Sequence, residues 1–345
     1  MNYKSILNLL GILLAIFSLS FIPPLILSVL YAEQLSEIFL YSFLFLIILG
    51  GFMWFASRQN DLPLNISDGF IITTMFWVVL ACAGSIPFYF FGLSANDAIF
   101  ESVSGITTTG ATVIVGLDEL PKSLLLYRQL LQWIGGMGLI ILAVAVMPAL
   151  GIGGGQLYKM ELPGSHGNQR LTPKITDSAK ALWKIYFGLT VICAFLYVLS
   201  GMNLFDAIAH SLSTVAGGGF STHDASIGFF NSGLIETVCI IFMLLSAASF
   251  AVHYAAIFGG KPLKYFYDSE FRFFLSVVAM IIILSIIIHS LSNSYTDILL
   301  NIRSSIFHTV SIVTTSGFTT ENYSLWPGFL PYLLLVGAFM GACSQ

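Results

Sequence analysis

A short segment occurs three times in this chain and constrains its fold more than any other feature. The copies read DAIFESVSGITTTGAT (97–112), DAIAHSLSTVAGGGFST (206–222) and SSIFHTVSIVTTSGFTT (304–320). Aligned without a gap, they place Gly110, Gly219 and Gly317 in one column, 109 and then 98 residues apart. A repeated unit sets the architecture of a chain, and this period is too long for a solenoid. It fits a repeat that holds two membrane spans with a short segment between them.

The composition gives the class of protein. Hydrophobic residues make up 57% of the chain and charged residues only 9%, whereas a soluble domain carries roughly 25% charged residues. We therefore predict an all-α polytopic membrane protein. None of the four cysteines forms a CxxC pair, and all lie in or beside apolar runs, so they are interpreted as buried thiols of a helical bundle. They are Cys82, Cys193, Cys239 and Cys343.

Apolar runs long enough to cross a membrane flank each repeated segment. About 20 apolar residues cover the hydrocarbon core. The first run lacks a small-residue cleavage site and is followed at once by a second span, so we do not expect a removed signal peptide. The pattern predicts two extra helices, then span, short segment and span three times over. The predicted spans are 6–31, 38–55, 69–91, 130–150, 185–201, 234–258, 273–291 and a last one from 329 onward.

The lysines and arginines predict the orientation. With the N-terminus in the cytoplasm, ten of the thirteen fall inside, as the positive-inside bias requires. All three repeated segments then lie on the outer side, with Lys122, Arg128 and Arg303. The ten inner residues are Lys4, Arg58, Lys159, Arg170, Lys174, Lys180, Lys184, Lys261, Lys264 and Arg272.

The repeated segments have the composition expected of an ion pore. Each is too short to span, and each ends in small or hydroxylated residues and a glycine: TTTG, AGGG and TTSG. Non-helical backbone at membrane depth is tolerated only in protein or beside a water-filled cavity. Inward carbonyls replace the water shell of a cation, and glycine permits the conformations this needs. One such segment is more typical of helix packing, but three in register between spans favour a pore.

Several further segments carry a resemblance to a known family. They are QWIGGMGLIILAVAVMPALGIGGGQL (132–157), RLTPKITDSAKALW (170–183), SFAVHY (249–254) and SGFTTENYSLWP (316–327). With the repeats, they make the chain similar to the superfamily of Trk, Ktr and HKT potassium transporters, in particular its bacterial TrkH branch. The resemblance implies a potassium-channel-like pore of span–pore helix–span repeats after two extra helices. It places the potassium filter on Thr108, Thr109, Gly110, Gly217, Gly218, Gly219, Thr315, Ser316 and Gly317.

The resemblance also implies a function and partners. Members take up potassium across the inner (plasma) membrane of bacteria as the transmembrane subunit of a Trk-type system. Potassium is the substrate, and no covalently bound cofactor is expected. The implied partners are a second copy of the chain and a cytosolic nucleotide-binding subunit of the TrkA type; nucleic acid is not one of them. Relatives with serine at the first filter position are associated with sodium, so Gly110 favours potassium.

The family pattern has four repeats, and three are found here. The predicted division is 1–60 for the extra helices, 61–158, 159–265 and 266–345 for the three pore repeats, with the fourth repeat absent. The closing FMGACSQ resembles the start of the intramembrane gate loop of the family. Three quarters of a ring leaves backbone groups without partners, which is costly in lipid. We therefore expect the 345-residue chain to be incomplete and inactive alone.

Two other functions remain as alternatives. A secondary cation carrier, coupled to sodium or protons, also uses broken helices at the midplane, but carriers place ionisable groups in their spans and these spans hold few. A membrane enzyme needs a catalytic cluster, and neither HExxH nor GxSxG occurs. We therefore do not expect an enzyme.

The remaining polar residues each have two interpretations. Glu101, His210 and His308 share one column of the repeats and are interpreted as buried hydrogen-bonding groups, with an ion-pathway or proton-sensing role as the alternative. His253 is expected to pack near the inner surface, and Arg128 to anchor an outer helix end in water. The glycine run 151–155 follows a span and not a strand, so it is not a nucleotide loop. The basic segment 159–184 is a candidate surface for anionic lipid or for the cytosolic partner.

Overall fold

The computed structural model describes residues 3–57, 66–146, 175–261, 263–292, 294–295 and 297–340. These residues form α-helices joined by loops and short 3-10 turns, and none of them lies in a strand. The prediction of an all-α protein is therefore confirmed. The chain divides into two units, one comprising Met1–Thr107 and Ala111–Glu161, the other Thr108–Gly110 and Leu162–Gln345.

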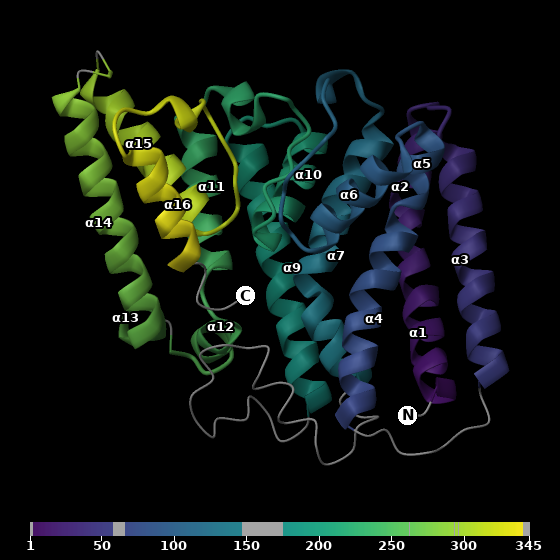
Figure 1. Ribbon diagram of the computed structural model, residues 1–345. Helices are drawn as coiled ribbons and strands as arrows, with labels where there is room; N and C mark the ends of the chain where they lie inside the picture. The colour runs from purple at the N-terminus through teal and green to yellow at the C-terminus, as the bar shows by residue number, and fades with distance from the viewer. Residues whose placement is uncertain are drawn as a thin grey trace. The chain divides into compact units, whose positions relative to one another are not determined.

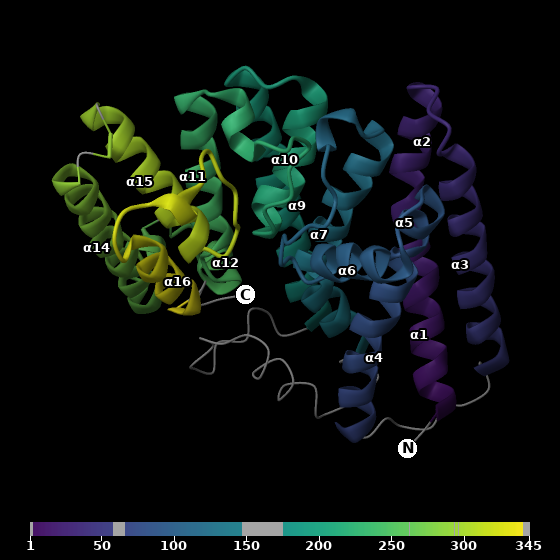
Figure 2. The same ribbon diagram turned by 45° about the horizontal axis from the view of Figure 1, so that its top comes forward.

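The first unit begins with two antiparallel spans, which lie side by side in Figures 1 and 2. Helix α1 (Tyr3–Ser18), a 3-10 turn (Leu19–Phe21) and α2 (Ile22–Leu30) form one continuous span, and α3 (Ser36–Ser57) returns. Pro23 and Pro24 do not break the span, because they lie in the first turn of α2, where a missing N–H costs no helical bond. Gly11 and Gly50 let the two backbones touch: a Cβ on Gly50 would lie 2.6 Å from the oxygen of Gly11.

The first repeat completes this unit. Helices α4 (Ile66–Gly84) and α5 (Ile86–Phe91) lead to the short α6 (Ala95–Ile106), and a 3-10 turn (Leu117–Glu119) leads to α7 (Lys122–Val146). Tyr127 of α7 is the centre of the core. Its ring contacts Phe21, Phe39 and Phe88 at centroid distances of 5.5, 5.6 and 5.2 Å, and its hydroxyl donates to Gly84 O at 2.7 Å. The aromatic contacts hold the extra N-terminal helices against the repeat.

The second unit contains the other two repeats. The second repeat runs through α9 (Ile175–Leu199), α10 (Leu204–Ala216), a 3-10 turn (Ser226–Phe230), α11 (Gly233–Ser246) and α12 (Phe250–Ile257). A short α13 (Lys264–Tyr267) joins it to the third, which has α14 (Ser269–Leu291), α15 (Ile298–Val313), a 3-10 turn (Tyr323–Leu325) and α16 (Leu330–Met340). Figures 1 and 2 show α14, α15 and α16 as neighbours.

The predicted continuous span 234–258 is wrong, because the structure breaks it between α11 and α12. Ser249 caps the new helix by accepting the N–H of Val252 at 3.4 Å. His253 is 1% exposed, and its Nε2 lies 2.9 Å from the backbone oxygen of Leu245, which also accepts the N–H of Ala248 at 3.1 Å where α11 ends. Its Nδ1 lies 2.6 Å from the hydroxyl of Tyr265. His253 therefore bridges the broken helix instead of only packing at an interface.

Five helical segments of the described residues are long and apolar enough to cross a membrane: Tyr3–Leu30, Ser36–Ser57, Asp68–Phe91, Lys180–Leu199 and Ser269–Leu291. The short helices α6, α10 and α15 each follow such a segment, as the repeats predict. Cys193 and Cys239 are buried as expected, whereas Cys82 is exposed, which corrects its interpretation as a buried thiol. The glycine run 151–155, the basic residues 159–174 and the closing residues 341–345 lie outside the described part of the chain.

Candidate functional site

The first two repeated segments begin as capped helices. In α6 the hydroxyl of Ser94 accepts the N–H of Asp97 at 3.2 Å, and in α10 the side-chain oxygen of Asn203 accepts the N–H of Asp206 at 2.9 Å. The acidic residue of each repeat therefore lies in the first helical turn, where the free N–H groups favour a negative charge. The third helix, α15, begins earlier than the repeat predicts, at Ile298, after the cap Asp297.

The backbone that follows these helices has the same unusual conformation in all three repeats. The residue two before the filter glycine has a positive φ, as does the glycine itself, and the residue between them does not. Such alternation aligns the N–H groups of successive peptides on one side. Because each C=O points opposite to its N–H, the carbonyls line the other side. The φ values are 55° and 77° for Thr108 and Gly110, 69° and 75° for Gly217 and Gly219, and 61° and 78° for Thr315 and Gly317.

A positive φ is costly for threonine, which has a branched Cβ. Thr108 and Thr315 nevertheless adopt it, whereas the second repeat has Gly217 at this position. Strained backbone of this kind persists only where the surrounding structure fixes it, and it is typical of functional sites. The sequence predicted these three residues as filter positions from their column, but not that two threonines would be strained.

Within the second unit, the predicted filter segments of the second and third repeats lie directly against each other. A Cβ added to Gly219 would lie 1.7 Å from the backbone oxygen of Ser316, so only glycine fits there. On the outer side, the N–H of Gly228 donates to Thr319 O at 3.1 Å, and the hydroxyl of Ser226 accepts the N–H of Thr319 at 3.2 Å. The two filter segments therefore form one connected structure.

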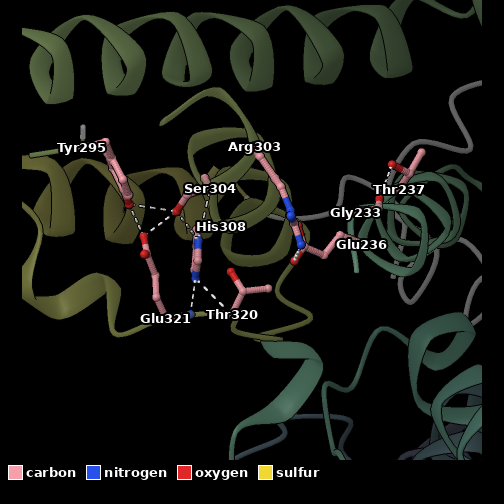
Figure 3. Close-up of polar contacts among 9 residues, drawn as sticks. All are labelled: Gly233, Glu236, Thr237, Tyr295, Arg303, Ser304, His308, Thr320 and Glu321. Carbon is pink, nitrogen blue, oxygen red and sulfur yellow. Dashed lines mark hydrogen bonds and ion pairs between the residues drawn. The ribbon is translucent and has the colours of Figure 1, made fainter. Parts of the chain in front are cut away.

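An ion pair joins the same two repeats (Figure 3). Arg303 of α15 donates from Nε to Oε2 of Glu236 in α11 at 2.5 Å and from its terminal nitrogen to Oε1 at 2.6 Å. Glu236 is 5% exposed, and its paired geometry is the strong two-point contact of arginine with a carboxylate. Arg303 was expected only to lie on the outer side. It ties the third pore helix to the span that leaves the second filter.

The three polar residues of the shared column are fully buried and contact the chain that leaves each filter. In the first repeat, both carboxylate oxygens of Glu101 lie 3.0 Å from the hydroxyl of Thr112. In the second, Nε2 of His210 lies 2.9 Å from the hydroxyl of Ser221. In the third, Nε2 of His308 accepts two backbone N–H groups at 3.3 and 3.4 Å. The interpretation as buried hydrogen-bonding groups is confirmed.

The predicted anchoring role of Arg128 in water is wrong. Arg128 and Glu101 are both 0% exposed, and Nε of Arg128 lies 2.7 Å from Oε1 of Glu101. A terminal nitrogen of Arg128 also donates to the hydroxyl of Thr112 at 3.0 Å. A buried carboxylate needs a compensating charge, and Arg128 supplies it one helix away, where no sequence spacing indicates the pairing.

One acidic residue of the third repeat, Glu321, was not singled out in the sequence. Its carboxylate accepts the hydroxyls of Tyr295 and Ser304, which lie 3.0 Å from each other (Figure 3). It also accepts the indole N–H of Trp326 at 2.9 Å. Burial raises the pKa of Glu321, but the hydrogen bonds from Ser304, Tyr295 and Trp326 outweigh it and hold that pKa below its usual range. The one available signal was its place four residues after Gly317.

The comparisons with known proteins identify the family. The family model of TrkH, cation transport protein, matches residues 35–345. The chain belongs to the TrkH family. It is 48% identical over 347 residues to the Trk system potassium uptake protein TrkH of Halomonas elongata and 47% identical over 349 residues to that of Vibrio parahaemolyticus. Both alignments cover 100% of this chain and 72% of the relative.

A solved structure of the TrkH family agrees with the fold. The crystal structure of the potassium transporter TrkH from Vibrio parahaemolyticus matches with a TM-score of 0.88 at 45% identity, over 100% of this chain and 72% of that one. The predicted family and the predicted polytopic fold with pore-helix repeats are confirmed.

Proposed function

We propose that this chain takes up potassium across a membrane through a filter of backbone carbonyls, as the transmembrane subunit of a Trk system. One observation carries the proposal: three separate segments share the alternating backbone conformation that lines up carbonyl oxygens. The proposed filter residues are Thr108, Thr109, Gly110, Gly217, Gly218, Gly219, Thr315, Ser316 and Gly317. The printed names of the relatives, potassium uptake proteins of Trk systems, support potassium as the cargo.

Carbonyl oxygens also explain why the site needs no charged ligand. A carbonyl dipole replaces a water molecule around a monovalent cation without holding it as tightly as a carboxylate does, so the ion also leaves. The pore helices enter with their C-terminal ends toward the filter, where the helix dipole favours a cation. Gly110 leaves the first filter position without a side chain, which supports potassium over sodium.

The location, the orientation, the repeat boundaries and the partners of the chain belong to the same proposal. We infer that the chain lies in the bacterial inner membrane with its N-terminus in the cytoplasm, which the distribution of lysine and arginine supports. We propose the repeat boundaries 1–60, 61–158, 159–265 and 266–345. A second copy of the chain and a nucleotide-binding subunit of the TrkA type are the proposed partners, and the chain is proposed to be no enzyme. Potassium is the substrate, with no covalently bound cofactor.

A secondary carrier is less well supported. Carrier sites use ionisable groups in the spans to couple the driving ion. Two buried acidic groups, Glu101 and Glu236, are instead held in ion pairs with Arg128 and Arg303. Each pair is a structural contact between helices, which favours a pore over a coupled carrier.

The experiment is growth of a bacterial strain whose own potassium uptake systems are deleted. A chimera carries residues 1–345 in place of the matching part of the Vibrio parahaemolyticus TrkH, which this chain covers to 72%. We expect it to restore growth at limiting potassium, and Gly219→Ala in the chimera to abolish that growth. Gly188→Ala in α9 is the matched control, because no atom of the described residues lies within 4 Å of its added Cβ.

Two results would count against the proposal. One is a chimera that reaches the membrane at the level of the parent protein and restores no growth. The other is unchanged potassium uptake in the Gly219→Ala chimera. A further arm, with residues 1–345 expressed alone, tests the sequence-based expectation that this chain does not conduct by itself, and growth there would refute that expectation.

A further inference from the structure

Glu101, His210 and His308 occupy the same position in the three repeats, and each makes an equivalent hydrogen-bond contact with different chemical groups. Each residue lies five positions into its repeat, is 0% exposed and faces the chain two to four residues after the filter glycine. The groups that it meets there are donors: a hydroxyl and the N–H of Val113 in the first repeat, a hydroxyl in the second, and two backbone N–H groups in the third. In every repeat, the residue at this position is therefore placed to accept a hydrogen bond from the chain that follows the glycine.

The hydrogen bond made by Nδ1 determines the tautomer of each of the two histidines. Nδ1 of His210 lies 2.9 Å from the backbone oxygen of Asp206, and Nδ1 of His308 lies 3.0 Å from that of Ser304. A carbonyl oxygen only accepts, so Nδ1 carries the proton and Nε2 offers a lone pair. The hydroxyl oxygen of Ser221 also accepts the backbone N–H of His223 at 3.1 Å. The hydroxyl proton of Ser221 is therefore donated to Nε2 of His210.

In the first repeat, the acceptor is a charged carboxylate instead of a neutral ring nitrogen. The carboxylate of Glu101 accepts from Thr112 and from the N–H of Val113 at 3.2 Å, and Arg128 compensates its charge. The three repeats therefore differ in residue type and charge but keep an acceptor at one place. Helix packing alone explains a buried side chain; it does not explain an acceptor aimed at the same short segment in three unlike environments.

We propose that Glu101, His210 and His308 are positioning residues for the three filters. They do not touch the cation. Each holds the chain that leaves its filter at a fixed distance from the pore helix, and this sets the position of the filter carbonyls and so the preference of the filter among cations. The inference rests on the proposed cation filter.

The test measures binding of potassium and sodium to the purified chimera that carries residues 1–345 in the Vibrio parahaemolyticus TrkH, from the cation-dependent rise in its unfolding temperature. His308→Leu removes the acceptor, and His308→Gln keeps an oxygen that accepts. We expect His308→Leu to lower the ratio of potassium to sodium affinity about tenfold, on the order of the loss of one hydrogen bond, and His308→Gln to restore most of it. His253→Leu is the control: it alters a buried histidine of α12 whose hydrogen bonds to Leu245, Ala248 and Tyr265 lie outside the three repeated segments, and it should leave the ratio unchanged.

Ser221→Ala gives a second, smaller perturbation, because it removes the donor that faces His210 and leaves the histidine in place. We expect the same fall in the ratio, even where His308→Leu does not fold. An unchanged ratio in both His308→Leu and Ser221→Ala would overturn the inference and leave the filter proposal standing. An unsubstituted chimera that does not prefer potassium over sodium would overturn the proposed filter, and the inference with it.

Discussion

Alanine substitutions at Gly219 and at Gly317 should distinguish two destabilising effects. Backbone strain affects both positions, whereas steric overlap with a neighbouring segment affects only Gly219. Gly219 and Gly317 have nearly the same φ, 75° and 78°, so a Cβ brings both the same conformational strain of about 1–2 kcal/mol. Only Gly219 is crowded. Its added Cβ would lie 1.7 Å from Ser316 O, whereas no described atom lies within 4 Å of a Cβ on Gly317.

The overlap at Gly219 cannot be relieved by a side-chain rotation, because the neighbouring atom is a backbone oxygen. An ordinary contact begins at 3.4 Å, so one filter segment must move by more than 1 Å. Forcing extra atoms into a packed site costs about 1–3 kcal/mol. We expect Gly219→Ala to destabilise the protein by about 2–5 kcal/mol and Gly317→Ala by about 1–2 kcal/mol.

The assay is thermal unfolding of the purified chain in detergent, followed by tryptophan fluorescence at one heating rate, because unfolding of such proteins is often irreversible. Gly219→Ala should unfold several degrees below Gly317→Ala, and the difference should persist in potassium and in sodium. Equal losses in the two variants, or a larger loss in Gly317→Ala, would refute the reasoning that contact between the filters decides the cost.

Three further predictions use the same assay. Gly135→Ala should destabilise strongly, because its Cβ would lie 2.0 Å from the oxygen of Ile106, whereas Gly188→Ala should be neutral or stabilising; similar losses would contradict this. The lowered pKa of Glu321 predicts stability that is full above pH about 4.5 and declines as the pH falls through its folded value, so Glu321→Gln should be less stable at neutral pH and lose less on acidification. Arg303→Gln should lower the free energy of unfolding by about 1–3 kcal/mol, because it removes the ion pair with Glu236. The double variant with Glu236→Gln should lose less than the sum of the two single variants, and a strictly additive loss would argue against the pair.

Much of the fold was predictable because membrane spans and repeats leave strong signals in a sequence. The glycine column located the three segments that share the alternating backbone conformation, and the acidic residues of α6 and α10 lie in the first turn as expected. The break between α11 and α12 was not predictable from hydropathy, since residues 247–249 are small and apolar enough to continue a span. It depends on bonds from His253 to atoms 8 and 12 residues away in the chain.

The sequence by itself determined the family and the position of the repeated segments, because those follow from residue types at fixed spacings, and it predicted the filter residues within them. Tertiary structure decided how the filter is held. The pairing of Glu101 with Arg128, of Glu236 with Arg303, and the contact of Gly219 with Ser316 join residues 27, 67 and 97 positions apart. Hydrogen bonds and ion pairs depend on distances of about 3 Å, and only folding brings such distant residues that close.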